Sequence, residues 1–159
     1  MKLEEMIREV NMDNVNIYMH TTINTVKASD GAYGIVLEMP REGKEVYTST
    51  HFGELDNCTK KCAELKTLLY ALRKFKRPCN ITIYTDSSYI QSGISWVPGW
   101  IASGWVTSKG NEVAYKEECQ EVMELLSNHK YHFEIKTPHT YKNWLEMETE
   151  RNREKARKA

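Results

Sequence analysis

The sequence has no surplus of charge of either sign, because 22 lysine and arginine residues are balanced by 22 aspartate and glutamate residues. A domain that binds nucleic acid usually carries a basic excess, so this balance argues against strong, non-specific attraction to phosphate backbones. The 159 residues, 40% of them hydrophobic and 28% charged, are enough for one globular domain with its own core.

Long apolar runs are also missing. No stretch comes near the roughly 20 apolar residues that a membrane-spanning helix needs, so we expect no association with a membrane. The N-terminal sequence MKLEEMIREV contains acids and lacks the long apolar core of a secretory signal. We therefore expect a cytoplasmic protein.

Cysteine is scarce, at four residues, and a chain of this size does not need disulfide bonds as staples. In a cytoplasmic protein, Cys58, Cys62, Cys79 and Cys119 are expected to be reduced thiols. Cys58 and Cys62 could share a metal ion, but no second pair of ligands lies near them in the sequence. The spacing therefore does not favour a zinc site.

Three strands are predicted in the first third of the chain. Residues 15–20 (VNIYMH) alternate between two faces. Residues 34–39 (GIVLEM) and 44–52 (KEVYTSTHF) follow, with a tight turn between them at residues 40–43. The short connections favour an antiparallel meander, and residues 53–58 are expected to form a loop.

The apolar residues among the first ten positions have helical spacing, which fits either a short helix or a frayed tail. We therefore divide the chain into an N-terminal extension, residues 1–13, and one domain, residues 14–159.

The rest of the chain alternates helices with strands. A long helix with an apolar face comes first, and Thr59 is its candidate N-cap. A strand, two helices, a last strand and a highly charged helix follow. In order, these six segments cover residues 59–75, 80–85, 87–94, 115–127, 131–135 and 143–157. A meander followed by β-α-β crossovers predicts an α/β fold with a mixed five-stranded sheet and helices on its faces.

The most informative stretch is residues 80–89, NITIYTDSSY. It is typical of a strand that ends on a carboxylate, Asp86, just before a helix. Open α/β sheets build their sites at the edge where such strands end. The first strand has a similar sequence, NIYMH beside TIYTD, so parallel neighbours in register would place His20 next to Asp86.

Two groups of residues have both a functional and a structural interpretation. Glu64 lies on the core-facing flank of the long helix, where it either meets a partner or reaches solvent at the edge of the helix. Trp100 and Trp105, in the segment WVPGWIASGW, either stack on nucleic-acid bases or pack against the core.

The last helix carries a regular row of acids. Glu146, Glu150 and Glu154 recur every four residues, and Arg151, Arg153 and Arg157 are available as their partners. This spacing is typical of a solvated helix face that is stabilised by ion pairs.

Six stretches, taken together, match one family: IYMH in the first strand, GAYGIVL, AELKTLLYAL, IYTDSSYIQSGI, WVPGWIASGW, and FEIKTPH before the last helix. No single stretch would be enough, but the combination is specific. From Val15 to the C-terminus, the chain resembles the ribonuclease H family. The resemblance implies an RNase H-like fold: a mixed five-stranded sheet with three antiparallel N-terminal strands and helices on both faces.

Ribonucleases H cut the RNA strand of an RNA–DNA hybrid, and the resemblance implies the same substrate here. In the family, four carboxylates hold two Mg²⁺ ions, which activate water and stabilise the leaving oxygen. Two of these acids are matched, Asp86 in the fourth strand and Glu64 in the long helix, and both would be catalytic metal ligands. His139 matches the loop histidine that is thought to assist proton transfer or product release.

Two acidic positions of the family are replaced. His20 stands where the first strand of the family has an aspartate, and as a metal ligand an imidazole suits Mn²⁺ or Zn²⁺ better than Mg²⁺. The acid of the last helix falls near Arg153, which would repel a cation and could pair with the remaining carboxylates. Glu150 or Glu154 would supply that acid after a small shift in register. The resemblance is therefore to a site with two of its four acids lost.

The residues that would contact the substrate are altered as well. Where the family has an Asn-Asn-Arg run, this chain has Lys60, Lys61 and Cys62, so phosphates could be contacted but no amide faces a base edge. Trp100 and Trp105 would also contact nucleic acid, but the segment IASG between them lacks the lysines common in the family. With zero net charge, these changes indicate weak affinity for a hybrid.

Three functions remain open. The first is an inactive or weakly active RNase H-like domain that binds an RNA–DNA hybrid, another nucleic acid or a partner protein, and that needs no metal. The second is a divergent ribonuclease H that uses Mg²⁺ or Mn²⁺ with His20, Glu64, Asp86 and a glutamate of the last helix. The third is a protein-interaction scaffold that keeps the fold without binding nucleic acid.

Overall fold

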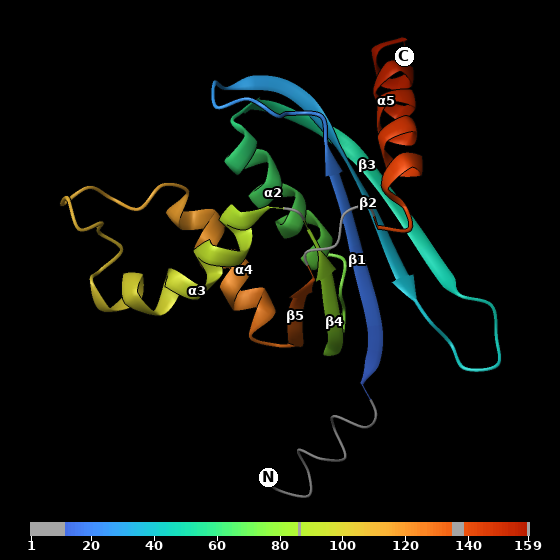
Figure 1. Cartoon of the computed structure of the whole chain (residues 1–159), viewed down its shortest axis with the longest axis horizontal. Coiled ribbons are helices and arrows are strands. Elements are labelled where there is room, and N and C mark those ends of the chain that lie inside the picture. The colour runs from blue at the N-terminus through green and yellow to red at the C-terminus, as the bar shows by residue number, and fades with distance from the viewer. Residues whose placement is uncertain (1–11, 86, 135–138, 159) are drawn as a thin grey trace, which may run out of the picture.

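The computed structural model describes residues 12–85, 87–134 and 139–158 (Figure 1). The segment expected to be a helix or a frayed tail, residues 1–10, lies outside the described residues, and so does Asp86. The first described element begins at Asp13. The division of the chain into residues 1–13 and 14–159 stays a prediction.

Five strands form one sheet in the described part of the chain, in the order β3-β2-β1-β4-β5. Strands β3, β2 and β1 pair antiparallel, and β1, β4 and β5 pair parallel. The strands are β1 (Asp13–Thr21), β2 (Ser29–Met39), β3 (Tyr47–Cys58), β4 (Cys79–Tyr84) and β5 (Lys130–Glu134). The mixed five-stranded sheet predicted from the sequence is confirmed.

Four helices follow the meander in the described residues, and Thr59 caps the first, accepting a hydrogen bond at Oγ1 from the backbone N–H of Cys62 at 3.2 Å. They are α2 (Lys60–Leu72), α3 (Ser88–Ala102), α4 (Lys116–Leu126) and α5 (Lys142–Lys158).

The two faces of the sheet bury different helices. Strands alternate, so Ile17 and Ile35 face one side, where they join a core with Leu68 of α2. Tyr18 and Val36 face the other side and pack with Leu145 of α5. Figure 1 shows α5 on one side of the sheet and α2 with α4 on the other, so helices cover both faces as predicted.

Three element boundaries were predicted wrongly by five residues or more: the start of β2, the end of β3 and the end of α3. Residues 53–58 belong to β3 and not to a loop, because β2 starts five residues earlier than expected and offers them partners, from Tyr33↔Gly53 to Ser29↔Cys58. Helix α3 continues past Pro98 to Ala102. The burial of Val97, 2% exposed, favours the longer helix although Pro98 removes one hydrogen bond.

The first and fourth strands, whose sequences are similar, are paired with each other in the sheet. β1 and β4 lie parallel with Ile17 opposite Ile83 and Tyr18 opposite Tyr84. The expected in-register pairing of these strands is therefore confirmed. Both strands end at the same edge of the sheet, and His20 follows Tyr18 there. The predicted contact of His20 with Asp86 stays a prediction, because Asp86 is not described.

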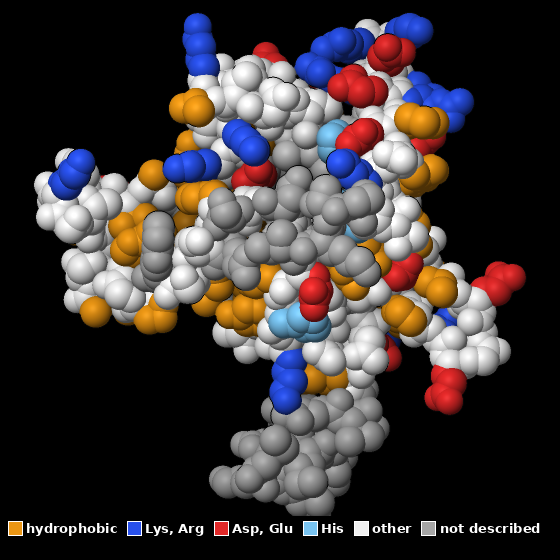
Figure 2. Space-filling view, in the orientation of Figure 1, with side chains coloured by type: hydrophobic (Ala, Val, Ile, Leu, Met, Phe, Trp, Pro, Cys, Tyr) orange, Lys and Arg blue, Asp and Glu red, His pale blue; other side chains and the backbone are white. Residues whose placement is uncertain are grey.

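The visible surface carries both signs of charge. In Figure 2, lysine and arginine side chains are interspersed with aspartate and glutamate over α2 and α5. Within the described ranges, no helix combines the length and the apolar character needed to cross a bilayer.

Candidate active site

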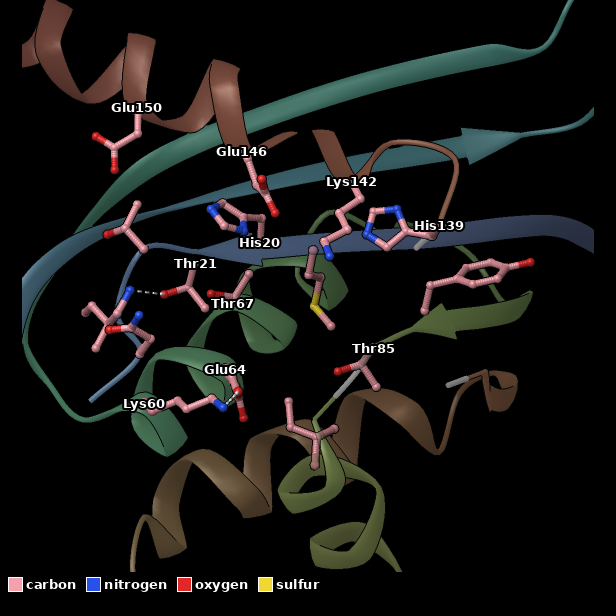
Figure 3. A pocket seen from close by; sticks show the side chains of 16 residues that line it. His20, Thr21, Lys60, Glu64, Thr67, Thr85, His139, Lys142, Glu146 and Glu150 are labelled. Carbon is pink, nitrogen blue, oxygen red and sulfur yellow. Dashed lines mark hydrogen bonds and ion pairs between the residues drawn. The ribbon is translucent and has the colours of Figure 1, made fainter. Parts of the chain in front are cut away.

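A cavity of about 560 Å³ opens where β1 and β4 end (Figure 3). Its walls come from the end of β1 and the loop that follows, the first turns of α2, the end of β4, the start of α3, the His139 loop and the first half of α5. The polar and charged residues lining it include His20, Lys60, Glu64, Thr67, Thr85, His139, Lys142, Glu146 and Glu150. Segments far apart in the sequence thus meet at the edge where the sequence predicted a site.

Glu64 is the carboxylate of α2 that enters this cavity. Its side chain is only 12% exposed and lies 4.0 Å from the ammonium of Lys60. It also accepts a hydrogen bond from the hydroxyl of Ser87, the N-cap of α3. Glu64 therefore does not reach solvent at the helix edge; it is held in the cavity by neighbours from two helices.

His20 and His139 bring two imidazoles to the same cavity. His20 lies near the end of β1, paired with Gly34 of β2. His139 lies in the loop before α5, where its Nδ1 accepts a hydrogen bond from the backbone N–H of Tyr141 at 3.2 Å. Because Nδ1 is an acceptor, the neutral ring of His139 carries its hydrogen on Nε2.

An aromatic cluster supports the loop of His139, and the sequence did not predict it. Tyr18 stacks on Tyr84 with centroids 4.6 Å apart, and the rings of His139 and Tyr141 lie 5.1 and 4.8 Å from Tyr18. Tyr141 donates a hydrogen bond to Glu38 at 2.5 Å, which with burial raises the pKa of Tyr141 to about 12. The sequence feature that could have indicated this cluster is Glu38, an acid in the otherwise apolar strand GIVLEM.

The three acids in the row on α5 are all exposed, and two of them also border the cavity. Glu146 and Glu150 line the cavity, whereas Glu154 is not among the described lining residues. Glu150 lies 3.9 Å from Arg153, so the exposure of the row and this ion pair agree with the predicted solvated face, and Glu146 and Glu150 border the cavity in addition. Figure 3 shows both carboxylates on the side of α5 that faces the cavity.

Arg153 is not among the described residues that line the cavity. Its guanidinium lies 3.9 Å from Glu150 and donates a hydrogen bond to the backbone carbonyl of Asp30 at 3.4 Å. Arg153 thus reaches the start of β2, and no contact with Glu64 is found among the described residues. The side chain that α5 presents to the cavity in this region is Glu150.

The predicted nucleic-acid contacts divide into two groups. Lys60 lines the cavity. Lys61 instead lies 5.3 Å above the ring of Tyr89, and neither it nor the two tryptophans are among the described lining residues. Trp100 and Trp105 are half-buried, 6.1 Å apart, and pack against the main core. Their position favours the packing interpretation.

The described residues alone do not form a metal site. Carboxylates are the ligands that Mg²⁺ prefers, but among the described residues no three histidine, cysteine, aspartate or glutamate side chains are grouped so that they could hold an ion. Glu64 and Glu150 each already have a cationic side chain within 4.0 Å. The donor set of the described lining residues therefore does not by itself fit a metal ion, and Asp86 is not among the described residues.

The four cysteines are free thiols, as expected. Cys58 and Cys62 are buried with their sulfur atoms 3.3 Å apart. Burial and the neighbouring Cys58 raise the pKa of Cys62 to about 12, so the protonated thiol is strongly favoured.

Sequence comparisons link the chain to ribonucleases H. The RNase H family model matches residues 12–153. Ribonuclease H of Cupriavidus pinatubonensis is 41% identical over 101 residues, which are 63% of this chain and 66% of that protein. Ribonuclease H of Francisella tularensis subsp. novicida is 38% identical over 100 residues, 62% of each protein. The matched segments thus span just under two thirds of the length of these relatives.

Solved structures share the fold. LC9-RNase H1, a type 1 RNase H with the type 2 active-site motif, gives a TM-score of 0.70 at 20% identity, over 86% of this chain and 70% of that one. A foamy viral protease-reverse transcriptase in complex with an RNA/DNA hybrid gives 0.58 at 17% identity, over 84% of this chain and 19% of that one. At such identities the likeness concerns the fold alone. With the family model matching nearly the whole described chain, and with this fold and these relatives, the chain belongs to the RNase H family.

Proposed function

We propose that this chain binds an RNA–DNA hybrid at the cavity and that its Mg²⁺-dependent cleavage of the RNA strand is lost or strongly reduced. The observation that carries the proposal is His20, which brings an imidazole to the cavity at the end of β1. Two relatives are named ribonuclease H, and one structural neighbour was solved with an RNA/DNA hybrid, which supports this class of ligand.

The chemistry of the lining residues accounts for the proposed loss. Two-metal cleavage needs several carboxylates that converge on one point, and Mg²⁺ strongly prefers oxygen ligands. His20 supplies a single nitrogen lone pair instead of two carboxylate oxygens. Glu64 has hydrogen-bonding and cationic neighbours, Ser87 and Lys60, that would compete with a metal ion for its oxygens.

A second candidate is a divergent nuclease that works with Mn²⁺. It is favoured by Glu150, which lines the cavity and would supply the acid that is missing at Arg153. In this case His20 would act as a nitrogen ligand, for which Mn²⁺ is better suited than Mg²⁺.

The two candidates differ in a hybrid-cleavage assay with Mg²⁺ or Mn²⁺. We expect His20→Asp to raise the Mg²⁺-dependent rate at least tenfold, equivalent to roughly 1.4 kcal/mol of transition-state stabilisation. Adding Glu64→Gln to His20→Asp should abolish the gain. Adding Arg153→Asp should not increase it, because Arg153 is not among the described lining residues.

Three results of this assay would count against the proposal. Efficient cleavage by the unmodified chain in Mg²⁺, abolished by Glu64→Gln, would contradict the proposal. Cleavage in Mn²⁺ alone, lost in both His20→Ala and Glu150→Gln, would favour the second candidate. If no hybrid is bound even at low ionic strength, the scaffold hypothesis replaces both.

A further inference from the structure

Lys142 is a cation inside the cavity that sequence reasoning did not single out. It is the first residue of α5, and Figure 3 shows its side chain reaching from the helix into the cavity, near His20 and His139. Across the described ranges, no hydrogen bond or ion pair engages its ammonium group. The residue is half-buried, so its charge is directed at the cavity and is not fully solvated.

Two of the three carboxylates that line the cavity in the described structure lie beside basic groups. Lys60 lies 4.0 Å from Glu64, and Arg153 lies 3.9 Å from Glu150. A divalent cation would have to compete with these basic groups for the same carboxylates. Lys142 and Glu146 are four residues apart on the cavity side of α5, and no ion pair joins them in the described structure.

An ammonium group is well suited to a phosphate. Lysine is a compact point charge with three N–H donors, and a charge-assisted hydrogen bond to a phosphate oxygen is stronger than a neutral one. A metal ion in this position would also bind phosphate oxygens, so a lysine can supply the same attraction without needing carboxylate ligands. The position of Lys142 therefore offers a substitute for a bound metal ion in substrate binding.

We propose that Lys142, assisted by Lys60, holds a backbone phosphate of the RNA–DNA hybrid in the place where a ribonuclease H would use a divalent metal ion, so that binding at this cavity is independent of metal. The inference rests on the proposed function and specifies how the same site binds its ligand. It concerns binding alone and requires no bond to be made or broken.

The test is a titration of a fluorescently labelled RNA–DNA hybrid with the full chain at low ionic strength, followed by anisotropy. One series contains EDTA and the other contains Mg²⁺, at matched ionic strength. We expect the two Kd values to agree within about twofold. Lys142→Gln should weaken binding by roughly tenfold in both series, the effect of losing one charge-assisted contact.

Two control variants make the result specific. Lys155→Gln removes an equivalent charge from the exposed end of the same helix and should leave Kd unchanged. Lys142→Arg keeps the charge and should retain most of the affinity, which separates loss of a contact from loss of structure. Circular dichroism of each variant verifies that α5 still forms.

The outcomes separate this inference from the proposed function. Hybrid binding that occurs only with Mg²⁺ overturns the inference and leaves hybrid binding itself standing. An unchanged Kd for Lys142→Gln, or an equal loss for Lys155→Gln, also overturns it. No binding in either series overturns both, because the hybrid is then not a ligand of this chain.

Discussion

At the scale of single residues, Thr149 combines a polar group with deep burial. It is 1% exposed on α5, and its hydroxyl has no hydrogen-bond partner among the described residues. Thr67 of α2 is equally buried, but its hydroxyl donates to the backbone carbonyl of Ala63 at 2.7 Å. An unsatisfied buried hydroxyl destabilises the folded state, whereas a satisfied one contributes to it.

The two threonines therefore predict opposite effects of the same change. Thr149→Val should increase the free energy of unfolding by about 1 kcal/mol, because it removes an unsatisfied group with little change in shape. Thr67→Val should decrease it by about 1 kcal/mol, because a hydrogen bond is lost. Urea denaturation of both variants measures the difference. Similar destabilisation by both substitutions would contradict this account of Thr149.

Single residues also show how far the sequence could predict the site. His20, Glu64 and His139 were identified from strand ends, helix flank and family resemblance, and all three line the cavity. The sequence could not decide between Glu150 and the other glutamates of the last helix, because they are one turn apart and only the packing of α5 shows which of them faces the cavity. The bond from Tyr141 to Glu38 joins residues 103 positions apart, so no local pattern predicts it.

At the scale of elements, the docking of α5 on the sheet depends on a residue without a side chain. Gly34 of β2 lies beneath α5, where a Cβ atom would collide with the Thr149 hydroxyl and come within 3.2 Å of Leu145. The close approach of this helix to β2 matters for the site, because α5 carries Lys142 and Glu146.

Gly34→Ala is thus expected to push α5 away from the sheet. We predict a loss of about 1–3 kcal/mol in the free energy of unfolding, the usual effect of overpacking. Gly99→Ala is the matched control: its Cβ would meet no atom within 4 Å, and inside α3 the change should stabilise by about 0.5–1 kcal/mol. Denaturant midpoints of the two variants provide the measurement. No destabilisation by Gly34→Ala would contradict the described packing.

The elements themselves were largely predictable, and the exceptions have physical causes. Strand alternation and helical periodicity located the strands and helices because each element has one buried face. The end of β3 was missed because GELDNC has no clear alternation and is held by its pairing with β2. The second half of α3 was missed because Pro98 and Gly99 oppose a helix locally, while the burial of Val97 favours it.

At the scale of the whole molecule, the chain has the RNase H fold, but it carries no net charge. The TM-score of 0.70 to a type 1 RNase H accompanies a formal net charge of zero. Without a basic excess, long-range attraction to a hybrid is weak, so the proposed binding depends on a few contacts within the cavity. The fold brings Lys60, Lys142 and His20 together in one cavity at the edge of the sheet.

The central claim is that this chain binds an RNA–DNA hybrid without cutting it when Mg²⁺ is the available metal. The most direct measurement is a single-turnover reaction in Mg²⁺, with protein in excess over a labelled hybrid and binding followed by anisotropy in the same sample. The account predicts that the hybrid is bound and that the RNA strand is recovered intact. Rapid cleavage of the bound RNA, abolished by Glu64→Gln, would contradict it.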